Sequence, residues 1–160
     1  MTLEVAVQYA APRRGVPAPV SLHRWATAAA AATGRRRGRL LIRVVGAAES
    51  AVLNRRYRAR AGATNVLSFG CDAPAPAAAG MLGDLVICAP VVAREARSQG
   101  KSSLAHWAHM VVHGVLHLVG YDHETSRQAR VMERLEMDIL ARLGYPDPYC
   151  EQDAHERRST

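Results

Sequence analysis

The sequence contains little cysteine, a single lysine and no long apolar run. Cys71, Cys88 and Cys150 are odd in number, widely spaced and without a CxxC pair, which argues against a disulfide framework or a cysteine-based zinc ribbon. No apolar run approaches the roughly 18 residues that span a bilayer, and the first residues lack the basic and apolar segments of a secretory signal. These absences argue against a membrane protein, and we expect a protein of the reducing cytoplasm.

The chain has the size and composition of one globular domain. Of its 160 residues, 49% are hydrophobic and 22% are charged, a balance that is typical of a chain with a buried core. No internal repeat or domain-sized linker divides it. We therefore expect a single domain over residues 1–150, followed by a charged and frayed tail at residues 151–160.

Positive charge is concentrated in the first third of the sequence. The net charge is +7, and residues 1–60 alone hold twelve arginines against Glu4 and Glu49, a balance of +10. A basic surface attracts anionic partners and is the expected footprint of nucleic-acid binding. The alternative interpretation is a solvated basic face in an arginine-rich chain, since Lys101 is the only lysine.

Local patterns indicate four strands and five helices, hence an α+β domain. Strand-like stretches occur at residues 3–9, 39–45, 64–69 and 82–88. Helices are expected at residues 21–33, 49–58, 90–100, 102–119 and 125–143. Ser21 is the expected N-cap of the first helix, and either Ser102 or Ser103 is the expected N-cap of the fourth. Thr125 with Gln128 matches a capping box. Residues 70–80 form a low-complexity loop.

Five of the seven histidines are clustered, at His106, His109, His113, His117 and His123. His113 and His117 are spaced i, i+4, so they project from one helix face and can share a metal ion. Gly120 falls where the helix must end, and a reversal of the chain there could return His123 to the same point. Three neutral imidazoles with one open position are typical of a catalytic zinc site.

The histidine spacing is similar to the zincin motif H-E-x-x-H-x-x-G-x-x-H, with one difference. The first histidine, His113, is followed by Gly114, where that motif has its general-base glutamate. A peptide hydrolase of that mechanism would lack the group that activates water. The pattern therefore keeps the metal site without the proteolytic base, which favours another substrate.

The segment HGVLHLVGYDH at residues 113–123 resembles the signature of the YbeY family of bacterial metal-dependent endoribonucleases, or rRNA maturation factors. Four further blocks resemble the family in the same order, namely LNRRYR (53–58), TNVLSF (64–69), LGDLVIC (82–88) and LGYPDPY (143–149). The resemblance covers about residues 39–149. It implies a single α+β domain with a mixed four-stranded sheet, about five helices and a zincin-like fold.

The resemblance also implies a site and a substrate. His113, His117 and His123 would bind one zinc ion per chain, and Arg58 would face the metal and hold an RNA phosphate. The family's activity implies single-strand-specific RNA cleavage in rRNA processing, at the 16S rRNA 3′ end, and in ribosome quality control. The expected partners are single-stranded RNA, rRNA and the small ribosomal subunit, with no membrane. A metal-bound water and the RNA 2′-hydroxyl both remain possible nucleophiles.

Two other functions remain open from the sequence. One is a metalloprotease-like zinc hydrolase, against which Gly114 counts. The other is a non-catalytic ribosome-assembly factor, in which a structural zinc supports the fold and the basic first third binds RNA.

Several polar residues near the signature blocks have two interpretations each. Asp84 could orient a ligand histidine or serve a structural role, and Asp122 could carry a proton or cap a helix. Asn65 and Ser68 could support the site or the strand. His106 and His109 are expected to be ordinary helix-surface histidines, with His109 as a possible site contact.

Overall fold

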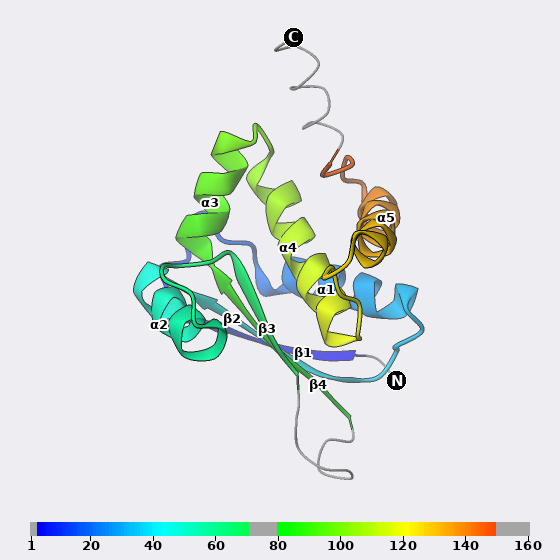
Figure 1. Ribbon diagram of the computed structural model, residues 1–160, viewed down its shortest axis with the longest axis horizontal. Coiled ribbons are helices and arrows are strands. Elements are labelled where there is room, and N and C mark those ends of the chain that lie inside the picture. The colour runs from blue at the N-terminus through cyan, green and yellow to red at the C-terminus, as the bar shows by residue number, and fades with distance from the viewer. Residues whose placement is uncertain (1–2, 71–79, 150–160) are drawn as a thin grey trace.

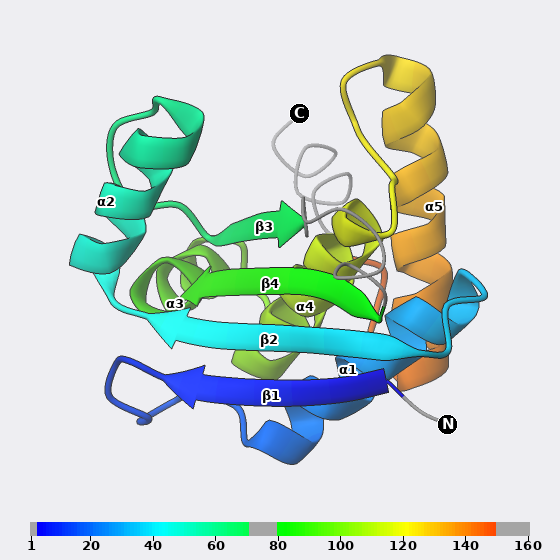
Figure 2. The same ribbon diagram turned by 90° about the horizontal axis from the view of Figure 1, so that it is seen from below.

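Four strands form one mixed sheet in the order β1-β2-β4-β3 (Figures 1 and 2). They are β1 (Leu3–Tyr9), β2 (Gly38–Val45), β3 (Val66–Gly70) and β4 (Met81–Cys88). β1, β2 and β4 are parallel, and β3 runs antiparallel to β4 at the edge. The computed structural model describes residues 3–70 and 80–149. The expected tail at 151–160, most of the 70–80 loop, Cys71 and Cys150 lie outside these ranges.

Five helices surround the sheet, which confirms the expected α+β fold. They are α1 (Pro19–Ala32), α2 (Ala47–Arg58), α3 (Ala89–Ser98), α4 (Ser103–Leu118) and α5 (Ser126–Leu143). Figure 1 shows α1, α3, α4 and α5 over one face of the sheet, and Figure 2 shows the sheet in front of them. None of the helices in the described ranges is both long and apolar enough to cross a membrane.

Most helix ends follow the sequence signals. The Ser102 hydroxyl accepts a hydrogen bond from the Ala105 amide at the start of α4, and Thr125 and Gln128 form a complete capping box. The expectation that Ser21 caps α1 is wrong. The helix begins earlier, at Pro19, because a proline fits the first helical position without losing an intrahelical hydrogen bond.

Helix α4 occupies the centre of the helical layer and lies directly on β3 and β4. Its buried residues include Trp107, Val111 and Val115. A Cβ atom at Gly114 would lie 2.7 Å from a methyl of the buried Leu85, so the glycine allows a close approach of helix and sheet. Gly114 therefore packs directly against the sheet, and this close packing leaves no room for the glutamate of the zincin motif.

A smaller apolar cluster lies beside α2 and joins strand residues of the opposite sheet face to Val91 at the start of α3. Its buried members are Val45, Leu67, Val86, Cys88 and Val91. Because side chains alternate along a strand, Asp84 lies on the same face of β4 as Val86, away from α4. Asp84 therefore faces away from the histidines of α4, which contradicts a role in orienting them.

Replacing either of two paired glycines of the sheet by alanine should have very different effects on stability. A Cβ at Gly83 (φ +142°) would lie 2.4 Å from the backbone oxygen of Phe69, whereas a Cβ at its cross-strand partner Gly70 meets nothing within 4 Å. We expect Gly83→Ala to lower the free energy of unfolding by about 2–4 kcal/mol. Gly70→Ala is the matched control and should change it by less than about 0.5 kcal/mol. Urea denaturation of both variants measures the difference, and equal stabilities would contradict the close strand contact.

Candidate metal centre

The three signature histidines converge at the C-terminal end of α4. Ring centroids of His113 and His117 are 4.8 Å apart, those of His117 and His123 are 4.8 Å apart, and those of His113 and His123 are 5.6 Å apart. One nitrogen from each ring lies within 4.8 Å of the other two. The reversal of the chain expected from the sequence therefore occurs, and the three side chains can reach one ion.

The reversal depends on Gly120. Its φ of +109° is in the left-handed region that glycine tolerates. The Gly120 amide donates to the His117 carbonyl (3.1 Å) and the Tyr121 amide to the Leu116 carbonyl (3.0 Å), which is the Schellman pattern. These two bonds end the helix and direct the following residues back over His117.

A buried carboxylate orients the first histidine. Glu136, on α5, is fully buried, and its two oxygens lie 2.6 Å from Nδ1 of His113 and 2.9 Å from Nε2 of His109. The hydroxyl of Tyr149 donates a hydrogen bond to the same carboxylate. With Nδ1 of His113 held by Glu136, Nε2 is left for a metal, and the carboxylate makes that nitrogen more basic.

The charge on Glu136 is stabilised by its neighbours. Burial alone would raise its pKa, but the hydrogen bonds from His109 and His113 outweigh burial and lower the pKa to about 2. Burial, and after it the same carboxylate, raises the pKa of the Tyr149 hydroxyl. Glu136 is therefore an anion that accepts hydrogen bonds, and Tyr149 is a neutral donor.

The donor set fits a divalent metal ion that binds imidazole nitrogen. Burial and then the neighbouring imidazoles of His113 and His123 lower the pKa of His117, which favours the neutral ring that a metal requires. A second group of His109, His113 and Glu136 also lies close together. Its atoms already bond one another, so we assign it to support of the histidine site.

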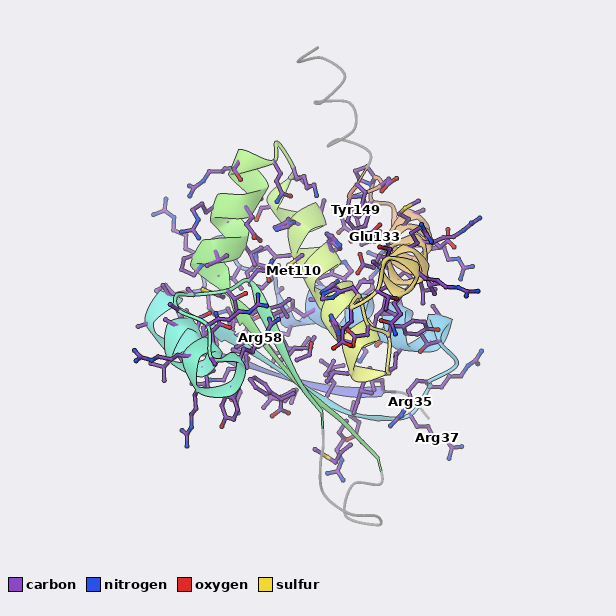
Figure 3. All side chains as sticks on the ribbon, in the orientation of Figure 1. Arg35, Arg37, Arg58, Met110, Glu133 and Tyr149 are labelled. Atoms are coloured by element: carbon purple, nitrogen blue, oxygen red, sulfur yellow. The ribbon has the colours of Figure 1, made fainter. Side chains whose placement is uncertain are left out.

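A cleft of about 930 Å³ opens in front of the histidines. It is lined by the end of α2, by β3, and by His113, His117 and residues 122–124. Arg58 lines the same cleft, and Figure 3 shows it beside α2 on the side toward α4. Within the part of the chain that the structure describes, Arg58 makes no ion pair or side-chain hydrogen bond. Its guanidinium group is therefore available to a ligand in the cleft.

Buried polar residues of α2 place Arg58 at the cleft. The Ser50 hydroxyl donates to the Thr64 carbonyl and accepts from the Thr64 amide, both at 3.0 Å, and Asn54 donates to the Gly62 carbonyl at 2.9 Å. These bonds clamp the segment between α2 and β3. Ala59 adopts a left-handed conformation (φ 54°) in order to end α2 directly after Arg58.

The other polar residues have structural partners. Asn65 donates to Glu95, and Ser68 donates to the Gly114 carbonyl at 3.2 Å, although both residues also line the cleft. Asp122 lines the cleft as well and accepts from the His123 amide. It does not cap α5, because Thr125 does.

The expectation that His106 and His109 lie on the helix surface is wrong. They are 3% and 7% exposed and bond to the carboxylates of Glu95 and Glu136, respectively. The sequence shows no acidic partner within α4, because both carboxylates come from other helices.

Glu136 and Tyr149 are the site residues that sequence reasoning missed. A signal for Glu136 was present, because it shares the apolar face of α5 with Met132, Ile139 and Leu140. A charged residue on a buried face requires a partner. Tyr149 lies within the LGYPDPY block but carries no spacing relation to the histidines, and only the fold brings it to Glu136.

Comparison with known proteins identifies relatives over most of the chain. A family model described as "Endoribonuclease YbeY" matches residues 21–144. Curated proteins called "Endoribonuclease YbeY" include one from Stenotrophomonas maltophilia, 57% identical over 153 residues that cover 92% of this chain and 94% of the relative. Another, from Nitrosococcus oceani, is 52% identical over 151 residues, covering 93% of this chain and 98% of the relative.

A solved structure shares the fold. The solution structure of TM1509 from Thermotoga maritima superposes with a TM-score of 0.56 at 18% identity, and the match covers 87% of this chain and 91% of that chain. At this identity the likeness supports the fold alone.

The Glu136 contact predicts metal affinity. We expect Glu136→Gln to weaken zinc binding by about 10- to 100-fold, because the neutral amide no longer orients His113 or raises its basicity. Glu133→Gln, on the same helix but half-exposed, is the matched control and should bind zinc as the unaltered protein does. Competition with a chelating dye measures both affinities. Equal affinity of the two variants would contradict an orienting role for Glu136.

Proposed function

Because the chain belongs to the YbeY endoribonuclease family, we propose that it is a zinc-dependent endoribonuclease that cuts single-stranded RNA in the 930 Å³ cleft. One observation carries the proposal. Three convergent histidines face the same cleft as Arg58, which has no ionic partner among the residues that the structure describes. This arrangement suits the cleavage of a phosphodiester, which needs positive charge to stabilise the phosphate oxygens and a group that transfers a proton.

Arg58 would hold the phosphate. A guanidinium group binds two phosphate oxygens at once and stays protonated throughout the reaction. In the proposed reaction it stabilises the charge that develops on the phosphate oxygens. The clamp made by Ser50 and Asn54 keeps α2 in place, so that the arginine need not be reoriented when RNA binds.

The histidines would hold the zinc ion. When bound, zinc supplies a Lewis acid for a phosphate oxygen and can lower the pKa of a water molecule to about 7. His117 is biased to the neutral form, and His113 is oriented by Glu136, so both rings are prepared as ligands. Asp122 and Glu124 line the cleft beside them and are candidates to take up a proton.

The position of Gly114 argues against peptide hydrolysis. The zincin general base would stand there, but this position packs against Leu85 and Val66 of the sheet. A glutamate side chain has no room at this point of α4. We therefore favour RNA cleavage over the metalloprotease alternative.

For the biological substrate we propose rRNA, with cleavage at the 16S rRNA 3′ end and a part in ribosome quality control. The support is the resemblance to rRNA maturation factors and the arginine-rich first third of the chain. The proposed setting is the small ribosomal subunit in the cytoplasm. Single-strand specificity belongs to the same proposal and rests on the family resemblance alone.

Cleavage of a single-stranded RNA oligonucleotide tests the proposal. We expect the purified protein to cut it, a chelator to stop it, and the folded variant His117→Ala to lose the activity, because it removes one of three zinc ligands. Equal cutting by protein and variant would show contamination or another site. A variant that unfolds would instead support the non-catalytic, structural-zinc alternative. The circular dichroism spectrum and melting temperature of the variant decide between these results.

Arg58 is tested separately against a neighbour on the same helix. We expect Arg58→Ala to lower kcat by about 100-fold, because it removes a charge that acts on the developing phosphate oxyanion. Arg55→Ala removes the same charge outside the cleft and should keep most of the activity. Single-turnover kinetics measure both variants, and equal rates would contradict the assignment of Arg58.

A further inference from the structure

The loop that carries His123 separates two hollows of the surface. Residues 122–124 line the cleft with Arg58. The preceding residues Val119, Gly120 and Tyr121 line a second hollow of about 360 Å³, together with Thr33, Gly34 and Arg35. The second hollow thus lies between the start of the loop that carries His123 and the turn between α1 and β2, residues 33–37, here called the basic turn.

The basic turn presents three consecutive arginines. Arg35, Arg36 and Arg37 are all exposed, and none of the three pairs with a carboxylate in the described ranges. Figure 3 shows Arg35 and Arg37 on one side of the C-terminal end of α4 and Arg58 on the other. Three neighbouring guanidinium groups without acidic partners form a strong anion-binding surface.

Backbone hydrogen bonds fix the turn at both ends. The amides of Gly34 and Arg35 donate to the carbonyls of Ala31 and Ala30 at the end of α1, and the Arg39 amide donates to the Gly80 carbonyl. The opposite wall is held by the Schellman bonds of Gly120 and Tyr121. The surface is therefore built on two anchored segments, which lowers the ordering cost of binding.

We propose that the basic turn is a second phosphate-binding subsite, which holds the RNA strand beyond the cleavage point on the Tyr121 side. The inference rests on the proposed function, because it extends the same RNA from the cleft into the second hollow. Arg58 and Arg60 line the cleft and Arg35 lines the second hollow, with Arg36 and Arg37 next to it in the turn. Figure 3 shows the C-terminal end of α4, which carries two of the histidines, between Arg58 and the labelled arginines of the turn. Positive charge on both sides favours a long polyanion over a single small anion.

Contacts at both sites need more than one phosphate. His123 lines the cleft and Gly120 lines the second hollow, on the two sides of one loop. A dinucleotide has a single internucleotide phosphate and can reach only one of the two sites, whereas a longer single strand can reach both.

The test compares two double variants of equal charge. Arg35→Gln with Arg37→Gln removes two guanidinium groups of the basic turn, and Arg94→Gln with Arg97→Gln removes two exposed ones from α3. Fluorescence anisotropy measures binding of a labelled single-stranded 12-nucleotide RNA between about 50 and 300 mM salt. We expect the basic-turn variant to bind about tenfold more weakly at low salt, with a log–log salt slope shallower by about 1.4. The α3 variant should lose less RNA affinity than the basic-turn variant, and its salt slope should change less.

RNA length provides the second arm. The loss of affinity in the basic-turn variant should shrink for a dinucleotide, because it cannot span both subsites. If the basic-turn variant binds the 12-nucleotide RNA as tightly as the α3 variant does, the subsite is overturned. If the loss is equal for both RNA lengths, it is a general charge effect, which also overturns the subsite.

The two proposals fail separately. Binding is measured independently of cleavage, so a protein that loses RNA affinity through Arg35 and Arg37 but cuts no RNA would keep the subsite and lose the enzymatic function. If the protein cuts RNA and the basic-turn variant binds RNA with unchanged affinity, the enzymatic function is kept and the subsite is lost.

Discussion

The site depends on how closely α4 lies on the sheet. Gly114 lets the helix backbone approach Leu85 and Val66, and the Ser68 hydroxyl bonds the Gly114 carbonyl across the interface. This contact fixes the rotation of α4 about its own axis. Because a helix is rigid, fixing the face that carries Gly114 also fixes the directions of the side chains on its other faces. With Gly114 facing the sheet, His113 and His117 face the cleft and the buried side of α5. A larger residue at this point would displace all of them together.

A second constraint is the burial of the Glu136 carboxylate. Removing a carboxylate from water costs several kcal/mol unless its oxygens are bonded, and here His109, His113 and Tyr149 supply those bonds. The contact joins α4, α5 and the segment after α5 in one network. The charge that positions the metal ligand therefore also links three parts of the chain, so stability and metal affinity are coupled at this residue.

The arginines of the basic first third of the chain have different surroundings in the fold. Arg43 is committed to an ion pair with Glu49 at 2.7 Å, whereas Arg58 lines the cleft and Arg35 lines the second hollow. Net charge alone could not make this division, since it counts an ion-paired arginine and an available one equally. The proposed path of RNA follows only the available groups, on either side of the histidines.

The sequence by itself determined what depends on neighbours along the chain. The i, i+4 spacing of His113 and His117, the reversal at Gly120 and the caps at Ser102 and Thr125 are local, so their geometry follows from residue order. The mixed sheet was expected from the family blocks, whereas the strand order β1-β2-β4-β3 came only from the structure. Tertiary structure alone brought Glu136 and Tyr149 to His113, turned Asp84 away, and buried His106 and His109. The family resemblance had placed Arg58 opposite the histidines, although no spacing along the chain relates it to them. These contacts join residues from different helices and strands. Packing and burial decide which residues meet, and the order of residues along the chain contains no information on such distances.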